Sequence, residues 1–378
     1  MIIQCEKCFA TIDNSMGVRV WSYEGRQMSN PKFSGLRPEF LNRQNVSISD
    51  DVVAIVDRAN PKMIRMFDSS SGKDMGEPIQ HQLDILEIAL GQAGLGSERK
   101  VAILDRNRDL YITPVHRSHL MKLGSMVDTF MWHAKTDMLA AVMDGKLCVW
   151  YYPNVVYVDP DLMTSTKSVR DGASFGKNPQ LVQFAETHVT IRKSDGASMC
   201  ASVSPFPSLL YEYVQSVQWE EAARLCRFVK DQSLWACLAA MAINGQELET
   251  AKEAFASIDE VDKLQYILYI KDIASAEGRA AELALFRRRP EEAEQILLQA
   301  SLYYRAIKMN IRLFNWERAL ELAIRYGVHI DTVCAYRQKY LQSFGKQETS
   351  PSFLEHSNVE INWDEIKARI KAEKDSED

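Results

Sequence analysis

A short-strand pattern recurs at a nearly constant interval through residues 1–200, and it constrains the fold more than any other feature of the chain. Each copy ends in an apolar anchor, as in the alternating segment Val18–Trp21. Successive anchors are 46, 45, 38 and 41 residues apart. A period of about 40–45 residues built from short strands is typical of WD40-type propeller blades. The anchors are Trp21, Phe67, Ile112, Trp150 and Ile191.

Each interval also contains an upstream apolar strand and a turn. Met138–Val142, for example, precedes Asp144 and Gly145, a pair that favours a tight hairpin because glycine adopts positive φ without steric cost. No copy carries both the Gly-His and the Trp-Asp pair in full, so we expect about five degenerate blades over residues 1–204. Since Trp21 lies only about twenty residues after Met1, we expect an incomplete first blade in a partial or open propeller. A truncated product or an incomplete gene model would explain such a start.

The period changes at the break Ser204–Ser208, beyond which alanine-rich amphipathic helices follow. Four helices begin with similar sequences and share an alanine at their fourth position. A small residue there allows paired helices to approach closely, as in TPR-like solenoids. The intervals of 29, 42 and 26 residues are irregular, so the sequence predicts an irregular TPR-like α-solenoid over residues 205–344. The shared alanines are Ala222, Ala251, Ala293 and Ala319.

Residues 345–378 form a separate tail, predicted as a polar connector and a short charged amphipathic helix. Trp363, Ile366 and Ile370 share one face of that helix. The pattern favours a helix that caps the solenoid over a dedicated partner-binding helix. We keep the three residues as candidate partner contacts.

Arg287, Arg288 and Arg289 form the sharpest basic cluster. They follow an apolar helix, where cations complement the C-terminal dipole, and Pro290 suits the first turn of the next helix. This structural role is favoured over a contact with an acidic partner, which stays a candidate. No aromatic residues are interleaved with the run, so RNA is disfavoured.

The sequence shows no catalytic constellation, and we predict no catalytic, cofactor or metal site. Cys5 and Cys8 lack a second Cys or His pair at zinc spacing, and His116 and His119 follow a strand with no glutamate between them. The glycine-rich segment 91–100 lacks the Gly-Lys-Ser/Thr order of a phosphate loop.

Composition excludes several classes of protein. The formal charge of −6 gives no global basic field for nucleic acid. The longest clean apolar run, Leu234–Ile243, is about half of what spans a bilayer, and the first residues lack a secretory layout. Seven cysteines are ordinary for a reducing compartment. A soluble intracellular protein without direct membrane insertion is expected, and the residues alone indicate a multivalent scaffold.

Five stretches, in the loops, the helices and the tail, carry a family resemblance: Ala173–Phe184, Arg288–Ala300, Tyr304–Lys308, Phe314–Ala323 and Val359–Lys367. They resemble the C-terminal part of the intraflagellar transport protein 80 family. The resemblance implies the latter part of a second propeller followed by a TPR-like region.

The resemblance implies a non-enzymatic scaffold subunit of intraflagellar transport complex B, in its peripheral subcomplex, that supports cilium assembly. It implies other complex B subunits as partners, self-association through the C-terminal half, and a location at the cilium or flagellum, its base and the cytoplasm. The family's first propeller, implicated in binding the calponin-homology-domain subunit, has no counterpart here, so that contact does not carry over. A coat or tethering scaffold is the alternative, and a propeller-hosted hydrolase is a remote one.

Overall fold

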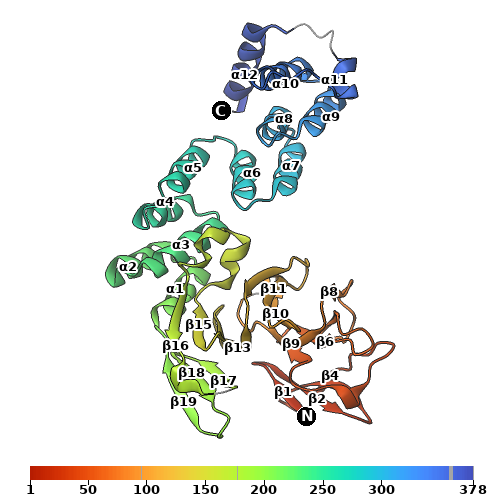
Figure 1. Cartoon of the computed structure of the whole chain (residues 1–378), viewed down its shortest axis with the longest axis vertical. Coiled ribbons are helices and arrows are strands. Elements are labelled where there is room, and N and C mark those ends of the chain that lie inside the picture. Colours follow the sequence, from red (N-terminus) through yellow and green to blue (C-terminus); the bar gives the residue numbers. More distant parts are fainter. Residues whose placement is uncertain (95, 177, 357–360, 378) are drawn as a thin grey trace. The chain divides into compact units, whose positions relative to one another are not determined.

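The computed structural model describes residues 1–94, 96–176, 178–356 and 361–377, and the chain divides into two compact units. The first unit, Met1–Met241, contains antiparallel sheets followed by helices, and the second begins at Ala242 and is helical (Figure 1). The described residues form five sheets. Their first strands contact one another in succession, from β1 to β5, β9, β13 and β17. This arrangement is that of successive propeller blades, as the sequence predicts.

Four sheets have four strands each, hydrogen-bonded in chain order, and the fifth has three. The first two sheets contain β1 (Ile2–Gln4), β2 (Cys8–Asp13), β3 (Gly17–Ser22), β4 (Gln27–Ser29), β5 (Val46–Ile48), β6 (Val52–Val56), β7 (Met63–Asp68) and β8 (Ile79–Gln80). The next two contain β9 (Ile85–Leu90), β10 (Lys100–Asp105), β11 (Leu110–Pro114), β12 (Met121–Gly124), β13 (Val127–Trp132), β14 (Leu139–Met143), β15 (Lys146–Trp150) and β16 (Lys167–Asp171). The last contains β17 (Gln180–Ala185), β18 (His188–Arg192) and β19 (Ser198–Ser202).

The prediction of an incomplete first blade is wrong. β1–β4 form a four-stranded sheet within the first 29 residues, because strands of three to six residues joined by tight turns need little sequence. Trp21 lies in the third strand of this sheet. Among the described residues, the sheet with fewer strands is the fifth.

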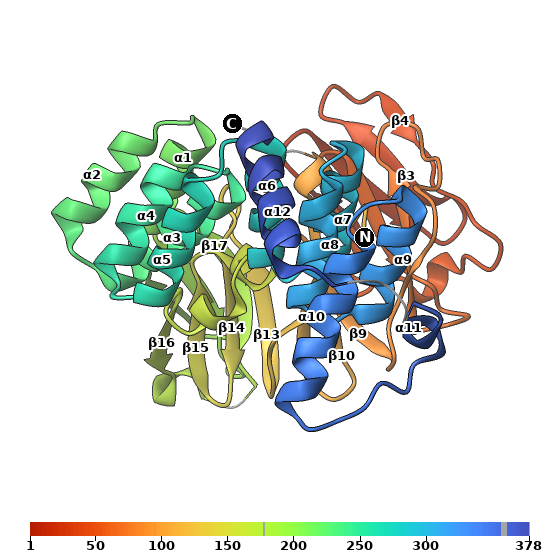
Figure 2. The same ribbon diagram turned by 90° about the horizontal axis from the view of Figure 1, so that it is seen from above.

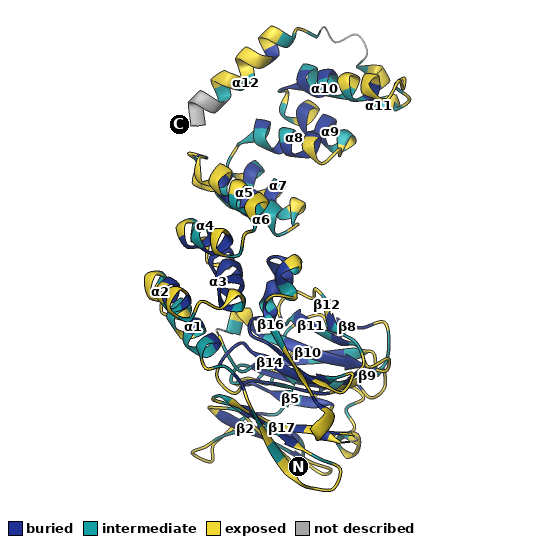
Figure 3. Cartoon of the chain, turned by 60° about the vertical axis from the view of Figure 1, so that its left-hand side comes forward, coloured by how far each residue is buried: buried dark blue, intermediate teal, exposed yellow. Residues whose placement is uncertain are grey.

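Residues with positive φ and one buried carboxylate stabilise turns of the sheets. Asp144 (φ 48°) and Gly145 (φ 67°) form the predicted turn between β14 and β15. In the third sheet, the buried Asp105 accepts hydrogen bonds from the backbone N–H groups of Asn107 and Asp109, and its other carboxylate oxygen lies 3.2 Å from His81 Nε2. The strands between these turns are mostly buried (Figure 3). β6 is buried at every position.

Twelve α-helices follow in the described part of the chain. They are α1 (Phe206–Gln215), α2 (Trp219–Val229), α3 (Gln232–Asn244), α4 (Leu248–Ser257), α5 (Val261–Lys271), α6 (Ala276–Phe286), α7 (Pro290–Gln299), α8 (Tyr303–Arg312), α9 (Trp316–Tyr326), α10 (Ile330–Ser343), α11 (Pro351–Glu355) and α12 (Trp363–Glu377).

The four helices that share an alanine begin where the sequence predicts, at the first residues of α2, α4, α7 and α9. All four shared alanines are fully buried, which confirms that they lie where the helices are packed. Neighbouring helices contact one another in antiparallel pairs such as α6 with α7 and α8 with α9 (Figures 1 and 2).

A repeated turn joins the helices. In seven connections of the described residues a non-glycine residue in the left-handed region lies two positions before the next helix. After Arg288, for instance, the N–H of Arg289 donates to the carbonyl of Ala284, the bond that ends a helix in a Schellman motif. The seven residues are Val217, Lys230, Gln246, Asp259, Arg288, Ser301 and Phe314.

The predicted tail contains two helices. α11 lies inside the segment predicted as a connector, because Pro351 starts a helical turn and Phe353 is buried. Residues 357–360 of that connector lie outside the described residues. The domain limits at 204/205 and 344/345 stay predictions, since the strands end at Ser202 and the compact units divide after Met241. No helix of the described residues has both the length and the apolar character needed to cross a bilayer.

Candidate functional site

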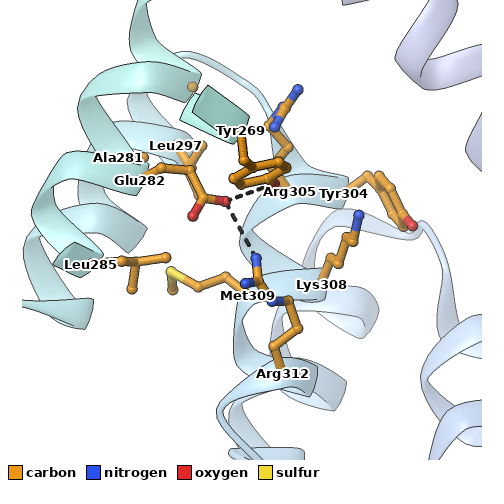
Figure 4. A pocket seen from close by; sticks show the side chains of 11 residues that line it. Tyr269, Ala281, Glu282, Leu285, Leu297, Tyr304, Arg305, Lys308, Met309 and Arg312 are labelled. Atoms are coloured by element: carbon orange, nitrogen blue, oxygen red, sulfur yellow. Dashed lines mark hydrogen bonds and ion pairs between the residues drawn. The ribbon is translucent and has the colours of Figure 1, made fainter. Parts of the chain in front are cut away.

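The second unit contains a cleft bounded by α5, α6, α7 and α8 (Figure 4). It is small, with about 30 Å³ of interior space open to water-sized groups, and it is partly open to solvent. A site of this size admits a single small group rather than a cofactor. The cleft is lined by Tyr269, Gly278, Ala281, Glu282, Leu285, Leu297, Tyr304, Arg305, Lys308, Met309 and Arg312.

Helix α8 supplies the basic side of the cleft. Arg305, Lys308 and Arg312 follow one another at spacings of three and four residues, which places them on one helix face. Ala306 and Ile307 lie between them in sequence and are fully buried, so the opposite side of α8 fixes the helix in the core. The three cations therefore reach the cleft from a rigid element.

Helix α6 supplies the single carboxylate of the lining, Glu282, whose side chain is 12% exposed. Its Oε2 accepts a hydrogen bond of 2.5 Å from the Tyr266 hydroxyl, and its Oε1 accepts one of 3.2 Å from Tyr269. Arg312 Nη1 lies 3.4 Å from the same Oε1 (Figure 4). Burial raises the pKa of both tyrosine hydroxyls, so they stay protonated and donate to the carboxylate.

Gly278 allows the first turn of α6 to approach its neighbours closely. A Cβ atom there would collide with Ser275 Oγ and lie 2.9 Å from Ile273 Cγ2, closer than van der Waals contact permits. It would also lie 3.6 Å from Arg305 Cζ, so glycine leaves the cleft side of α6 open beside that guanidinium.

The predicted basic cluster lies between α6 and α7, outside the cleft lining. α6 ends at Phe286 and α7 begins at Pro290, as the sequence predicts. Arg287 donates to the carbonyls of Ile243 and Asn244 at the end of α3, and Arg289 pairs with Glu292 at 3.2 Å. Arg287 thus contacts the carbonyl end of α3, whereas the role favoured from sequence at the end of α6 and partner contact by this cluster both stay predictions.

The apolar face of α12 contacts α10. Trp363 meets Tyr336 edge-on with ring centroids 5.5 Å apart, and Ile366 is fully buried. Ile370 lines a depression with the same helices. These contacts are those of a capping helix, and use of Trp363, Ile366 and Ile370 by a partner stays a prediction.

The other motifs singled out from sequence lie outside the cleft lining. Cys5 and Cys8 face each other at a hairpin turn with Sγ atoms 3.2 Å apart, and Arg99 donates to the carbonyls of Gly91 and Ala93 in the glycine-rich loop. Among the residues whose positions are described, no group of three or more His, Cys, Asp or Glu side chains could hold a metal ion.

Sequence reasoning missed the cleft. The one feature of the cleft that the sequence displays is the spacing of the three cations on α8. Glu282 and its tyrosine partners become neighbours only because α5, α6 and α8 pack together.

Comparison with known families covers both units. Residues 1–206 match the family model "IFT80 second beta-propeller". The chain belongs to the intraflagellar transport protein 80 family. Residues 234–378 match a second model, "IFT80/172/WDR35/WDR19 TPR domain", in agreement with the predicted TPR-like solenoid.

Relatives of the intraflagellar transport protein 80 family match nearly the whole chain. It is 48% identical to the "Intraflagellar transport protein 80 homolog" of Mus musculus over 99% of its length, and equally identical to that of Rattus norvegicus. It spans about half of both relatives, 49% of each. The "Intraflagellar transport protein 172 homolog" of Mus musculus is 21% identical over 79% of this chain and 18% of the relative.

Proposed function

We propose that this chain acts as a scaffold subunit of intraflagellar transport complex B, in its peripheral subcomplex, and supports protein transport in cilia and their assembly. The observation that carries the proposal is the 48% identity to the mouse homolog over 99% of the chain. Five sheets and a series of paired helices offer separate surfaces to different partners, which suits a multivalent scaffold. The proposed location is the cilium or flagellum, with its base and the cytoplasm.

We propose a role without catalysis. Relatives named as intraflagellar transport proteins support this view, and the described lining of the α5–α8 cleft contains no histidine, cysteine or serine that would act as base or nucleophile. The division into a propeller over 1–204, a solenoid over 205–344 and a tail over 345–378 belongs to the same proposal.

The proposed partners are other complex B subunits, and self-association through the C-terminal half is a further proposal. A contact with the calponin-homology-domain subunit is not proposed, because the matched family model is the second propeller. Arg287, Arg288, Arg289 and the apolar residues of α12 stay candidates for partner contact. No nucleic-acid partner is proposed.

Affinity purification of the tagged chain from ciliated cells, with mass spectrometry of the recovered proteins, tests the proposal. We expect peripheral complex B subunits with the whole chain and their loss when residues 205–378 are removed. Unchanged recovery without those residues would contradict the assignment of contacts to the helices. Recovery of vesicle-coat or tethering subunits would replace the proposal with the alternative scaffold.

A further inference from the structure

We propose that the cleft between α6 and α8 binds a carboxylate side chain from an acidic segment of a protein partner. The inference goes beyond the proposed function, because it assigns a ligand chemistry to one site and does not depend on which assembly holds the chain. Its ground is the composition of the cleft and the way in which Glu282 is satisfied.

The lining contains more basic than acidic side chains. Three of the eleven lining residues are basic and one is acidic, whereas the chain as a whole carries a formal charge of −6. A local concentration of cations on an acidic protein attracts anionic groups to that place. Arginine also matches a carboxylate geometrically, because its planar fork donates two parallel hydrogen bonds.

Arg312 is the residue best placed to receive the incoming group. Its side chain is 48% exposed, and its contact with Glu282 Oε1 is long, at 3.4 Å. Tyr266 and Tyr269 already donate to the two oxygens of Glu282. Arg312 can therefore turn to a second carboxylate without leaving Glu282 buried and unpaired, which would otherwise oppose binding.

The walls of the cleft suit the side chain of a glutamate or aspartate. Leu285, Leu297 and Met309 add apolar walls for the methylene groups of such a side chain. Tyr269, 39% exposed, lies at the edge where a peptide would enter.

Fluorescence polarisation with a fluorescein-labelled oligoglutamate peptide tests the proposal on the full chain at low ionic strength. Replacing Arg312 by glutamine should weaken binding about fivefold, the scale of one partly exposed ion pair. Arg325→Gln is the matched control, because it removes the same charge from an exposed position on α9 outside the cleft lining. It should change affinity less than about twofold.

A second variant predicts the opposite sign. Glu282→Gln removes the one acidic group of the lining, so oligoglutamate should bind about threefold more tightly, by the ordinary scale of a like-charge contact. Far-UV circular dichroism identifies a variant that fails to fold, in which case Lys308→Gln replaces it and should weaken binding.

Four results would overturn the proposal. They are no binding of oligoglutamate, equal binding of its glutamine counterpart, equal losses for Arg312→Gln and Arg325→Gln, and tighter binding of oligouridylate with the same dependence on Arg312. The last result would assign the cleft to nucleic acid. The polarisation assay contains no other subunit, so its outcome is independent of the co-purification experiment. Failure of the polarisation assay would contradict only the carboxylate-binding cleft, and failure of co-purification would contradict only the proposed function.

Discussion

Replacing Ala319 by glutamate tests whether the shared alanines hold the helices together. Ala319 lies in α9, is fully buried, and belongs to a hydrophobic cluster that includes Ala293, Ala323 and Val333. A glutamate at this position would place a carboxyl group among side chains that offer no partner in that cluster.

The cost follows from two effects. Extra side-chain atoms in a packed core destabilise by about 1–3 kcal/mol. An unsatisfied buried polar group adds about 1–3 kcal/mol, since the carboxyl would take up a proton rather than stay charged. We expect a loss of about 3–5 kcal/mol, a large part of the roughly 5–15 kcal/mol that stabilises an ordinary domain.

Thermal unfolding of the full chain, followed by circular dichroism at a helical wavelength, measures the loss. A loss of this size lowers the midpoint by about 10–17 °C in a unit of this length. The matched control is Ile324→Glu on the same helix, where the side chain is 47% exposed and the effect should be small. Equal midpoints for the two variants would refute the view that Ala319 lies at a helix–helix contact.

Three further predictions concern charge and backbone strain. Burial raises the pKa of Glu87 to about 7, so the stability of the chain should fall as pH rises from 5 to 8. Glu87→Gln should remove this pH dependence and raise the free energy of unfolding by about 2 kcal/mol at pH 8, measured by urea unfolding. The side chain of Arg337 lowers the pKa of Glu348 to about 2, so the stability that this pair contributes should be lost as pH falls from about 4.5 to 2. Glu348→Gln should cost about 1 kcal/mol at pH 7, and the stability of this variant should depend less on pH between about 4.5 and 2. Val217→Gly should raise stability by about 0.5–1 kcal/mol, because an exposed β-branched residue there has φ 59°, whereas Val261→Gly, in the first turn of α5, should lower it. A glutamine variant with the same pH dependence of stability as the unmodified chain would contradict the prediction for that glutamate. A change of stability in the same direction for both glycine variants would contradict the third prediction.

The repeat period and the helix starts could be predicted from sequence because both depend on local signals. Short strands with alternating apolar and polar residues are separated by turns, and the Asp144–Gly145 pair forms one of these turns. The error in the first sheet came from measuring blade length by anchors. Trp21 lies on the third strand, and a blade with three-residue edge strands fits in less sequence than the average repeat suggests.

The turns between helices could not be predicted in the same way. Glycine usually occupies the left-handed position that ends a helix, yet Val217, Phe314 and Arg288 adopt it here. The hydrogen bond across the turn and the packing of the following helix outweigh a local preference of about 1–2 kcal/mol per residue. A local rule therefore places the helix start correctly and still misses the conformation two residues before it.

The cleft was beyond sequence reasoning for a different reason, because its chemistry depends on how three helices meet. By sequence alone, Arg312 would be interpreted as a solvated cation and Glu282 as an exposed acid on a mostly apolar helix. Pairing of α5 with α6 buries Glu282 and gives it two tyrosine hydroxyls, and this arrangement changes what Arg312 can do. Without the tyrosines, Arg312 would be held as the sole partner of a buried carboxylate; with them, it is able to exchange that contact for a partner's carboxylate. The proposed role of Arg312 thus depends on the hydrogen bonds that Tyr266 and Tyr269 donate to Glu282.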